Sequence, residues 1–191
     1  MFILVPKNSG LGKYRQIGLL YLSKLDILRV IEVRGEDIPF WICKLQEKGI
    51  SAVGLTGEDL FQDFCLGQTE NKPRIIKRIV WNDPEAKFGK PTLCLIGPKG
   101  RDLLGFKKAI TVCVASKYKN IAERYLAKLS GKGFSFDVIY INGCVESSIT
   151  EGIADLVIDI VYTGSSIERA GLKVYEKIFQ SDFLIIGDQY D

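Results

Sequence analysis

The chain contains 191 residues, of which 47% are hydrophobic and 26% are charged, and its net charge is +3 at pH 7. This is the composition of an ordinary globular protein, and the charge is too small to indicate nucleic acid or a membrane as a partner. Histidine is absent, which excludes Ser-His-Asp and Cys-His nucleophilic schemes.

The cysteines show no arrangement typical of a bridge or a metal site. They are Cys43, Cys65, Cys94, Cys113 and Cys144. Their number is odd and no pair has C-x-x-C spacing, which argues against a zinc site and favours free thiols in a reducing compartment. The first residues lack a basic leader, and the apolar runs are far shorter than a membrane span. We therefore expect a cytoplasmic protein.

In the first half of the chain, short apolar runs alternate with amphipathic segments. The pattern predicts strands at residues 2–5, 28–33, 52–55, 75–81 and 92–96, and helices at residues 13–25, at residues 37–48 and after Thr56. Asp37 is the expected cap of the second helix, with Pro39 in its first turn. Residues 82–91 are rich in turn formers and form the expected hinge or loop.

A second cycle of the same kind follows. The pattern predicts strands at residues 110–114, 136–141, 156–161, 174–178 and 183–186, a helix at residues 116–130, and a short helix after residue 141. No internal repeat is visible in the sequence. The alternation predicts an α/β fold with largely parallel sheets, arranged in two lobes.

The most informative stretch runs from Ala154 to Ile167. An apolar strand carries Asp159 close to its carboxyl end and then breaks into the turn Thr163-Gly164-Ser165-Ser166. Backbone N–H groups and hydroxyls at such a turn form a site for a phosphate, and a nearby carboxylate can accept hydrogen bonds from ribose hydroxyls. This is the chemistry of a ribose 5-phosphate site. The alternative is an ordinary turn, with Ser165 or Ser166 acting only as a helix cap.

Three polar turns follow strands in this way. They are Lys7-Asn8-Ser9-Gly10, Thr56-Gly57-Glu58-Asp59 and Thr163-Gly164-Ser165-Ser166. Ligands of α/β sheets bind outside the carboxyl ends of the strands, so the three turns together indicate a cleft. Each turn on its own is equally typical of simple turn and cap chemistry.

Several blocks of the chain, in order, resemble the ATP phosphoribosyltransferase family. The blocks are Arg34-Gly35-Glu36-Asp37-Ile38-Pro39, then residues 53–60, residues 115–122, and residues 143–146 through 152–155 to 159–167, with Gly171-Leu172 near the end. A single block would be a weak signal, but the order and spacing hold from Arg34 onward.

The resemblance implies a two-lobed α/β fold like that of type II periplasmic solute-binding proteins, with the active site in the cleft between the lobes. We expect residues 1–90 and 170–191 to form the first lobe and residues 91–169 the second. The implied reaction transfers the 5-phosphoribosyl group of phosphoribosyl pyrophosphate to N1 of ATP and releases pyrophosphate. It is the first step of histidine biosynthesis.

The resemblance also implies roles for individual residues. The loop of Thr163, Gly164, Ser165, Ser166 and Ile167 would hold the 5-phosphate, and Asp159 would contact the ribose hydroxyls. Glu146 and Asp59 match acidic positions that face the site, and Lys7 matches a lysine near the pyrophosphate. Together with Arg34 and Mg²⁺ bound to the diphosphate, Lys7 can offset the charge of the leaving group.

Three features depart from the family pattern. The first turn reads Lys7-Asn8-Ser9-Gly10, whereas family members usually have Lys-Gly-Arg, and Lys13 and Arg15 are candidates to replace the basic group. Ser166 stands where threonine is usual. The chain stops at Asp191, without a regulatory domain or a terminal helix. The resemblance therefore implies a short form that assembles as a homo-oligomer and can depend on a regulatory subunit like histidyl-tRNA synthetase.

Two other functions remain open from the sequence. One is a non-catalytic paralogue that binds a nucleotide or a phosphosugar, which the altered first turn supports. The other is a solute-binding protein, because the two-lobed architecture is shared. The missing leader and the free cysteines argue against the second.

Overall fold

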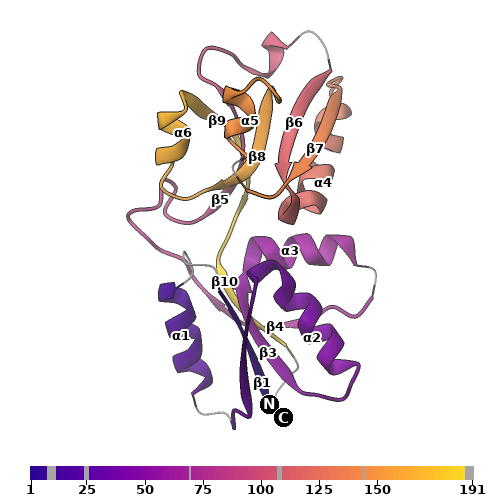
Figure 1. The fold of residues 1–191 in the computed structure, drawn as a ribbon, viewed down its shortest axis with the longest axis vertical. Coiled ribbons are helices and arrows are strands. Elements are labelled where there is room, and N and C mark those ends of the chain that lie inside the picture. Colours follow the sequence, from indigo (N-terminus) through magenta and orange to yellow (C-terminus); the bar gives the residue numbers. More distant parts are fainter. Residues whose placement is uncertain (8–11, 24–25, 69, 107–108, 144, 188–191) are drawn as a thin grey trace. The chain divides into compact units, whose positions relative to one another are not determined.

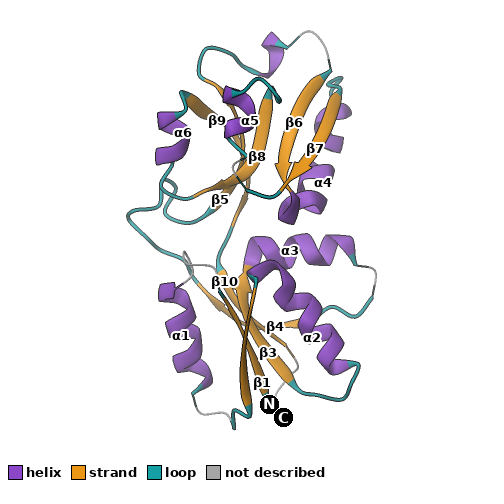
Figure 2. Cartoon of the chain, in the orientation of Figure 1, coloured by secondary structure: helices purple, strands orange, loops and turns teal. Residues whose placement is uncertain are grey.

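Two five-stranded sheets organise the chain, as the computed structural model shows (Figures 1 and 2). The structure describes residues 1–7, 12–23, 26–68, 70–106, 109–143 and 145–187. The chain divides into two units, of which the first comprises Met1–Trp81 and the chain from Asp182 onward, and the second comprises Asn82–Ser181. Each unit contains one sheet, flanked by helices. The α/β fold with two units is confirmed.

The first unit is built from strands β1, β2, β3, β4 and β10. Its elements are β1 (Phe2–Pro6), α1 (Gly12–Leu22), β2 (Arg29–Val33), the 3-10 turn η2 (Gly35–Asp37), α2 (Ile38–Gln46), β3 (Ala52–Gly57), α3 (Glu58–Gly67), β4 (Arg74–Ile79) and β10 (Phe183–Gly187). The strand order is β2-β1-β3-β10-β4. β1 runs parallel to β2 and β3, whereas β10 runs antiparallel to β3 and β4.

Helices cover both faces of this sheet, which explains why β3 is buried at every position. Gly54 of β3 lets α2 approach, because a Cβ there would lie 2.3 Å from Ile38. On the opposite face, Gly18 of α1 packs on Leu55 in the same way. Asp37 precedes α2 as expected but makes no capping hydrogen bond with its side chain, since it ends the turn η2.

The second unit is built from strands β5 to β9. Its elements are β5 (Thr92–Pro98), η3 (Leu103–Gly105), β6 (Ile110–Ala115), η4 (Ser116–Tyr118), α4 (Lys119–Ser130), β7 (Phe136–Ile141), α5 (Ser147–Thr150), β8 (Leu156–Val161), α6 (Ser165–Arg169) and β9 (Leu172–Gln180). The strand order is β7-β6-β8-β5-β9. β6 runs parallel to β7 and β8, whereas β5 runs antiparallel to β8 and β9.

The two sheets share one topology, although the sequence shows no repeat. Each has three parallel strands, then an antiparallel strand, then an edge strand antiparallel to that one. The sheets are therefore mixed rather than largely parallel, which corrects the expectation. Periodicity identifies strands, but the direction of a strand depends on its connection, and a parallel neighbour requires a crossover.

The boundary between the units also differs from the expected lobes. β9 pairs with β5 along its length, with Lys177 opposite Cys94, and so residues 172–180 lie in the second unit. Residues 82–90 belong to the second unit as well. The sequence assigns both segments to the first lobe, because strand-like patterning does not reveal which strand is the partner.

Candidate functional site

The turn after β8 gathers hydroxyl groups on its surface. Gly164 has a φ of 81°, a left-handed conformation that side chains rarely adopt, and it directly precedes α6. Thr163 and Ser165 hydroxyl oxygens lie 3.1 Å apart, and the backbone N–H of Ser165 donates to Thr163 Oγ1 at 3.3 Å. Ile167 is buried, whereas Thr163, Ser165 and Ser166 are exposed. The turn is thus anchored by an apolar side chain and presents its hydroxyls to solvent.

Asp159 lies on β8, near the carboxyl end where this turn begins. Its side chain is half-buried, and Oδ1 accepts a hydrogen bond from the backbone N–H of Ile160 at 2.7 Å. Cys94 of β5 is its direct partner across the sheet. Burial raises the pKa of Cys94 from 9.0 to about 12, and the positive charge of Lys177 opposes this rise. Asp159 therefore borders a buried, neutral thiol.

Glu146 lies next to the first turn of α5 and is half-buried. In that helix, Ser148 is buried and donates to the carbonyl of Val145 at 2.6 Å. Burial raises the pKa of Cys113, a hydrogen bond with Ser148 lowers it, and the charge of Asp159 raises it. Cys113 is the partner of Val157 across the sheet, so its side chain lies on the same face of the sheet as that of Asp159, two residues further along β8.

The segment before β5 folds against the turn after β8, which the sequence did not indicate. The backbone N–H of Lys87 donates to the carbonyl of Tyr162 at 2.7 Å, and the Tyr162 hydroxyl donates to Asp83. The Lys87 side chain lies over Gly164 and donates to Glu168 Oε1 at 2.7 Å. That hydrogen bond and the charge of Lys87 lower the pKa of Glu168. Lys87 is therefore a candidate site residue that was missed, because no local pattern reports contacts between residues so distant in sequence.

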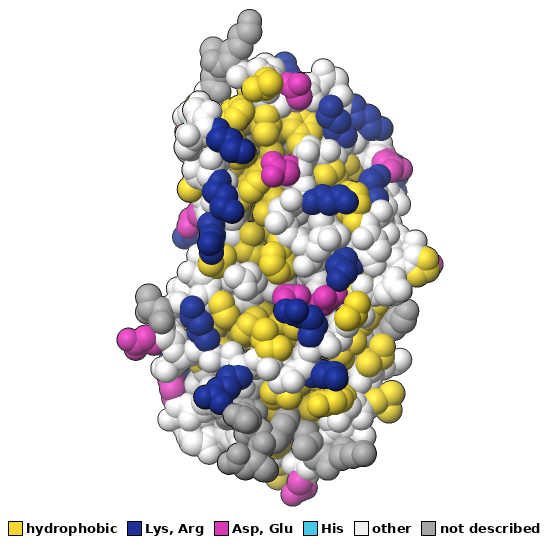
Figure 3. All heavy atoms as spheres, turned by 180° about the vertical axis from the view of Figure 1, so that it is seen from behind, with side chains coloured by type: hydrophobic (Ala, Val, Ile, Leu, Met, Phe, Trp, Pro, Cys, Tyr) yellow, Lys and Arg dark blue, Asp and Glu magenta, His cyan; other side chains and the backbone are white. Residues whose placement is uncertain are grey.

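A hollow of about 550 Å³ lies beside α6 and β9. Four lysines line it, namely Lys87, Lys99, Lys173 and Lys177. The ammonium of Lys177 lies 4.0 Å from the centre of the Phe88 ring, and that of Lys173 lies 5.3 Å from the centre of the Tyr175 ring. On the face shown in Figure 3, lysine and arginine side chains are scattered among hydrophobic and acidic ones. Glu168 and Glu176 also line the hollow, so its four lysines are interspersed with two acidic groups.

In the first unit, the carboxyl ends of β1, β2 and β3 bring Lys7, Arg34 and Asp59 to one edge of the sheet. The backbone N–H of Lys7 donates to the carbonyl of Val33 at 2.9 Å, so Lys7 lies beside the residue that precedes Arg34. Lys7 and Arg34 are exposed. Asp59 is buried in the first turn of α3, with 5% of its surface exposed.

The loops at this edge are tied together by Thr56, whose hydroxyl donates to the carbonyl of Gly35 at 2.8 Å. Asn8, Ser9 and Gly10 lie outside the described residues, as does the side chain of Lys13. Arg15, the other candidate for the missing basic group, donates to Glu32 Oε1 at 2.5 Å. Its charge is thus engaged with β2.

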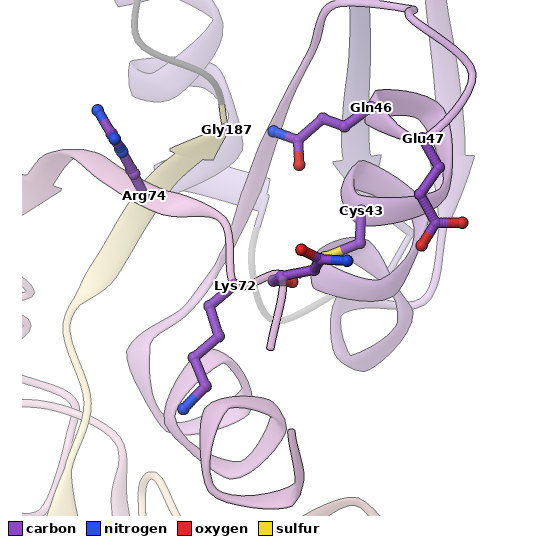
Figure 4. Close-up of a pocket in the computed structure, with 7 residues that line it drawn as sticks. Cys43, Gln46, Glu47, Lys72, Arg74 and Gly187 are labelled. Atoms are coloured by element: carbon purple, nitrogen blue, oxygen red, sulfur yellow. The ribbon is translucent and has the colours of Figure 1, made fainter. Parts of the chain in front are cut away.

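A second hollow, of about 630 Å³, opens at the other end of the first sheet (Figure 4). Cys43 and Gln46 lie near the end of α2 and Glu47 directly follows it, whereas Arg74 begins β4 and Lys72 precedes it by two residues. Cys43 Sγ donates to the carbonyl of Asn71 at 2.7 Å. This hollow adjoins the amino end of β3, whereas Lys7, Arg34 and Asp59 follow the carboxyl ends, so it does not belong to the predicted site.

The ten predicted site residues thus fall into two groups. Lys7, Arg34 and Asp59 lie at the carboxyl edge of the first sheet, and the other seven lie at the carboxyl edge of the second. Within the described part of the chain, no cluster of three or more acidic or cysteine side chains is placed to hold a metal ion. The same residues contain no helix long and apolar enough to cross a membrane.

Comparisons with known proteins agree with the resemblance seen in the sequence. A family model described as ATP phosphoribosyltransferase matches residues 34–190. The ATP phosphoribosyltransferase of Caldicellulosiruptor bescii is 29% identical over 162 residues, which cover 85% of this chain and 68% of the relative. That of Caldicellulosiruptor saccharolyticus is 30% identical over 152 residues, covering 80% and 64%. The chain thus spans about two thirds of the length of these curated relatives.

Solved structures show the same fold. The ATP phosphoribosyl transferase (HisG:HisZ) complex from Thermotoga maritima has a TM-score of 0.73 at 21% identity, covering 98% of this chain and 87% of that one. The periplasmic aliphatic sulphonate binding protein SsuA from Escherichia coli has a TM-score of 0.56 at 14% identity, covering 96% and 60%. At these identities the likeness concerns the fold alone.

Proposed function

The chain belongs to the ATP phosphoribosyltransferase family, and we propose that it transfers the 5-phosphoribosyl group of phosphoribosyl pyrophosphate to N1 of ATP. In this reaction the N1 lone pair forms a bond to C1′ of the ribose, and the bond from C1′ to the pyrophosphate oxygen breaks. It is the first step of histidine biosynthesis. The observation that carries the proposal is the pairing of Asp159 with the turn Thr163–Ile167, inside the matched region.

The turn after β8 is assigned to the 5-phosphate. The hydroxyls of Thr163, Ser165 and Ser166 are exposed at one turn, and Gly164 leaves no side chain between the backbone N–H groups and the ligand. Hydrogen bonds from hydroxyl and backbone donors to a charged phosphate are short and strong. Ile167 supports the turn from the buried side. This arrangement supports binding of a phosphomonoester at the end of β8.

Asp159 and Glu146 are assigned to the ribose and the reacting centre. As C1′ separates from the pyrophosphate, the ribose gains oxocarbenium character and positive charge. Carboxylates that are already in place stabilise that charge and hold the ribose hydroxyls in position. Asp159 near the end of β8 and Glu146 beyond the end of β7 both lie at the carboxyl edge of the second sheet, which supports these roles.

Lys7, Arg34 and Asp59 are assigned to substrate binding from the first unit. Lys7 and Arg34 are exposed cations beside adjacent strand ends, and they would offset the charge of the pyrophosphate. Mg²⁺ would be carried by the diphosphate oxygens, where it neutralises part of the leaving charge. The oxygen ligands for such an ion would come from the diphosphate itself.

The proposal extends to assembly. The Thermotoga maritima structure is a complex of HisG with HisZ. We propose that this chain likewise forms a homo-oligomer and acts with a regulatory subunit like histidyl-tRNA synthetase.

A coupled assay of pyrophosphate release tests the function. The chain is incubated with ATP, phosphoribosyl pyrophosphate and Mg²⁺, with and without a candidate partner subunit. Release that requires both substrates supports the proposal. If neither mixture releases pyrophosphate while the chain still binds ribose 5-phosphate, the chain is a non-catalytic paralogue. The altered first turn favours that alternative.

A further inference from the structure

We propose that Lys87 is a direct ligand of the 5-phosphate and that Glu168 competes with the phosphate for its ammonium group. The inference rests on the proposed role of the turn Thr163–Ile167, and it adds a residue from a distant segment. In the absence of ligand the lysine is held by Glu168, and binding of the phosphate exchanges one anionic partner for the other.

The backbone of Lys87 is held in place by a network of hydrogen bonds. Its N–H donates to the carbonyl of Tyr162 at 2.7 Å, which is the residue before Thr163. The Tyr162 hydroxyl donates in turn to Asp83. Asp83 also accepts from the backbone N–H of Glu85 at 3.0 Å, which folds residues 83–87 into a tight turn. The segment thus forms a second wall beside the phosphate turn.

The side chain of Lys87 extends over the centre of that turn. A Cβ on Gly164 would lie 2.8 Å from Lys87 Cδ and 3.4 Å from its Nζ. The ammonium is therefore within a few bond lengths of the backbone that would hold the phosphate. A lysine ammonium acts as a compact point charge with three donors, so it can bind a phosphate oxygen from this position after a small rotation of its side chain.

The ion pair with Glu168 is weak enough to be exchanged. Nζ of Lys87 lies 2.7 Å from Glu168 Oε1, but 62% of the glutamate side chain is exposed and 35% of the lysine side chain is exposed. Ion pairs in such positions contribute little, because water screens both charges. A phosphomonoester carries nearly two negative charges near neutral pH and offers more acceptors than one carboxylate. The phosphate is thus the stronger partner.

The competing interpretation is a static bridge that only fastens residues 83–87 to α6. The two interpretations differ in what happens when Glu168 loses its charge. If Glu168 competes with the ligand, its neutralisation frees Lys87 and strengthens binding. If the bridge only positions the turn, its neutralisation weakens binding just as removal of the lysine would.

Calorimetric titration with ribose 5-phosphate tests the inference, with ribose as the ligand that lacks the phosphate. The variants are Lys87→Met, Glu168→Gln and the double variant. Lys173→Met is the matched control, since that lysine lines the same hollow but lies over Tyr175. Far-ultraviolet circular dichroism and thermal unfolding verify that each variant is folded.

We expect Lys87→Met to lose about tenfold or more in affinity for ribose 5-phosphate, the effect of one hydrogen bond to a charged group. Glu168→Gln should gain about twofold to fivefold. The double variant should match Lys87→Met, because Glu168 has no lysine left to hold, and Lys173→Met should bind like the wild type.

Three outcomes would overturn the inference. If Lys87→Met binds as tightly as the wild type, Lys87 is no ligand, while the role of the phosphate turn stands. If Glu168→Gln weakens binding as much as Lys87→Met, the pair is a static bridge. If the wild type binds neither ribose 5-phosphate nor phosphoribosyl pyrophosphate, both this inference and the proposed function fail.

Discussion

Asp159 of β8 lies directly opposite Cys94 of β5, in the middle of the second sheet. Cys94 is fully buried, and Lys177 of β9 is its partner on the other side. The carboxylate is thus placed on a strand whose other side chains are apolar, close to the end that carries the phosphate turn. A charged group in such a position is costly unless it has a polar partner or a ligand.

The first prediction distinguishes a role of Asp159 in turnover from the structural role of the nearby Asp155. Asp159→Asn should lower turnover by about a hundredfold or more, because the amide cannot stabilise developing positive charge at the ribose. Its melting temperature should change little. Asp155→Ala is the control: Asp155 accepts from the backbone N–H of Thr111 at 3.0 Å, and its loss should cost about 1 kcal/mol of stability without changing turnover. Steady-state kinetics and thermal unfolding compare the two, and a stability loss with full turnover in Asp159→Asn would contradict the assignment.

A second prediction concerns the backbone of the phosphate turn. Gly164→Ala should sharply weaken ribose 5-phosphate binding, since Gly164 has a φ of 81° and a Cβ would meet Lys87. Gly133→Ala is a matched control, because Gly133 has a φ of 95° with open space where its Cβ would stand. Both variants should lose about 1 kcal/mol of stability from backbone strain, but only Gly164→Ala should lose affinity in a calorimetric titration. Equal affinities of the two variants for ribose 5-phosphate would show that this turn does not bind the phosphate.

Lys7 provides a third test, on the pyrophosphate side. Lys7→Ala should weaken phosphoribosyl pyrophosphate binding by about tenfold or more and ribose 5-phosphate binding only slightly, because only the first ligand carries the diphosphate. Arg15→Ala serves as the control, since that guanidinium is already paired with Glu32. The ratio of the two dissociation constants is the readout. Equal losses for both ligands in Lys7→Ala would place Lys7 elsewhere in the site.

The fourth prediction concerns stability at alkaline pH. Burial raises the pKa of Cys94 from 9.0 to about 12, and burial with a hydrogen bond to Glu176 raises the pKa of Tyr125. The folded state therefore keeps protons that the unfolded chain loses, so this stabilisation is complete below pH 9 and falls as the pH rises toward 12. Each group contributes a slope of up to about 1.4 kcal/mol per pH unit.

Urea unfolding at several pH values above 9 measures this slope. Tyr125→Phe and Cys94→Ala should each make the decline shallower, whatever their effect on stability at pH 7. A decline that is unchanged in both variants would mean that other groups cause it.

The sequence alone gives a candidate site, whereas it does not give the pairing of the strands. Asp159 and the turn Thr163–Ile167 were identified because a strand, a carboxylate and a hydroxyl-rich turn are adjacent in the chain. The family resemblance is confirmed by the match over residues 34–190. The roles assigned to individual residues stay predictions until the variants are measured.

Other features lay beyond the sequence because they depend on long-range contacts. Lys87 belongs to a segment that reads as an ordinary loop, and only the fold brings it over Gly164. Arg15 is a candidate from the sequence to replace a missing cation, but β2 places Glu32 within reach of its guanidinium. The partner of β9 could not be inferred either, since an amphipathic edge strand fits many sheets.

The position of β10 has a consequence for synthesis on the ribosome. β10 lies between β3 and β4 in the first sheet, yet it is made after the entire second unit. Residues 82–181 are contiguous and can begin to fold once they have emerged, whereas β4 has no route into its sheet until residues 183–187 arrive. Until then the edge of β3 in the nascent first unit is open, and an open edge of this kind can pair with other chains. The half of the protein that is translated first is therefore the half that is completed last.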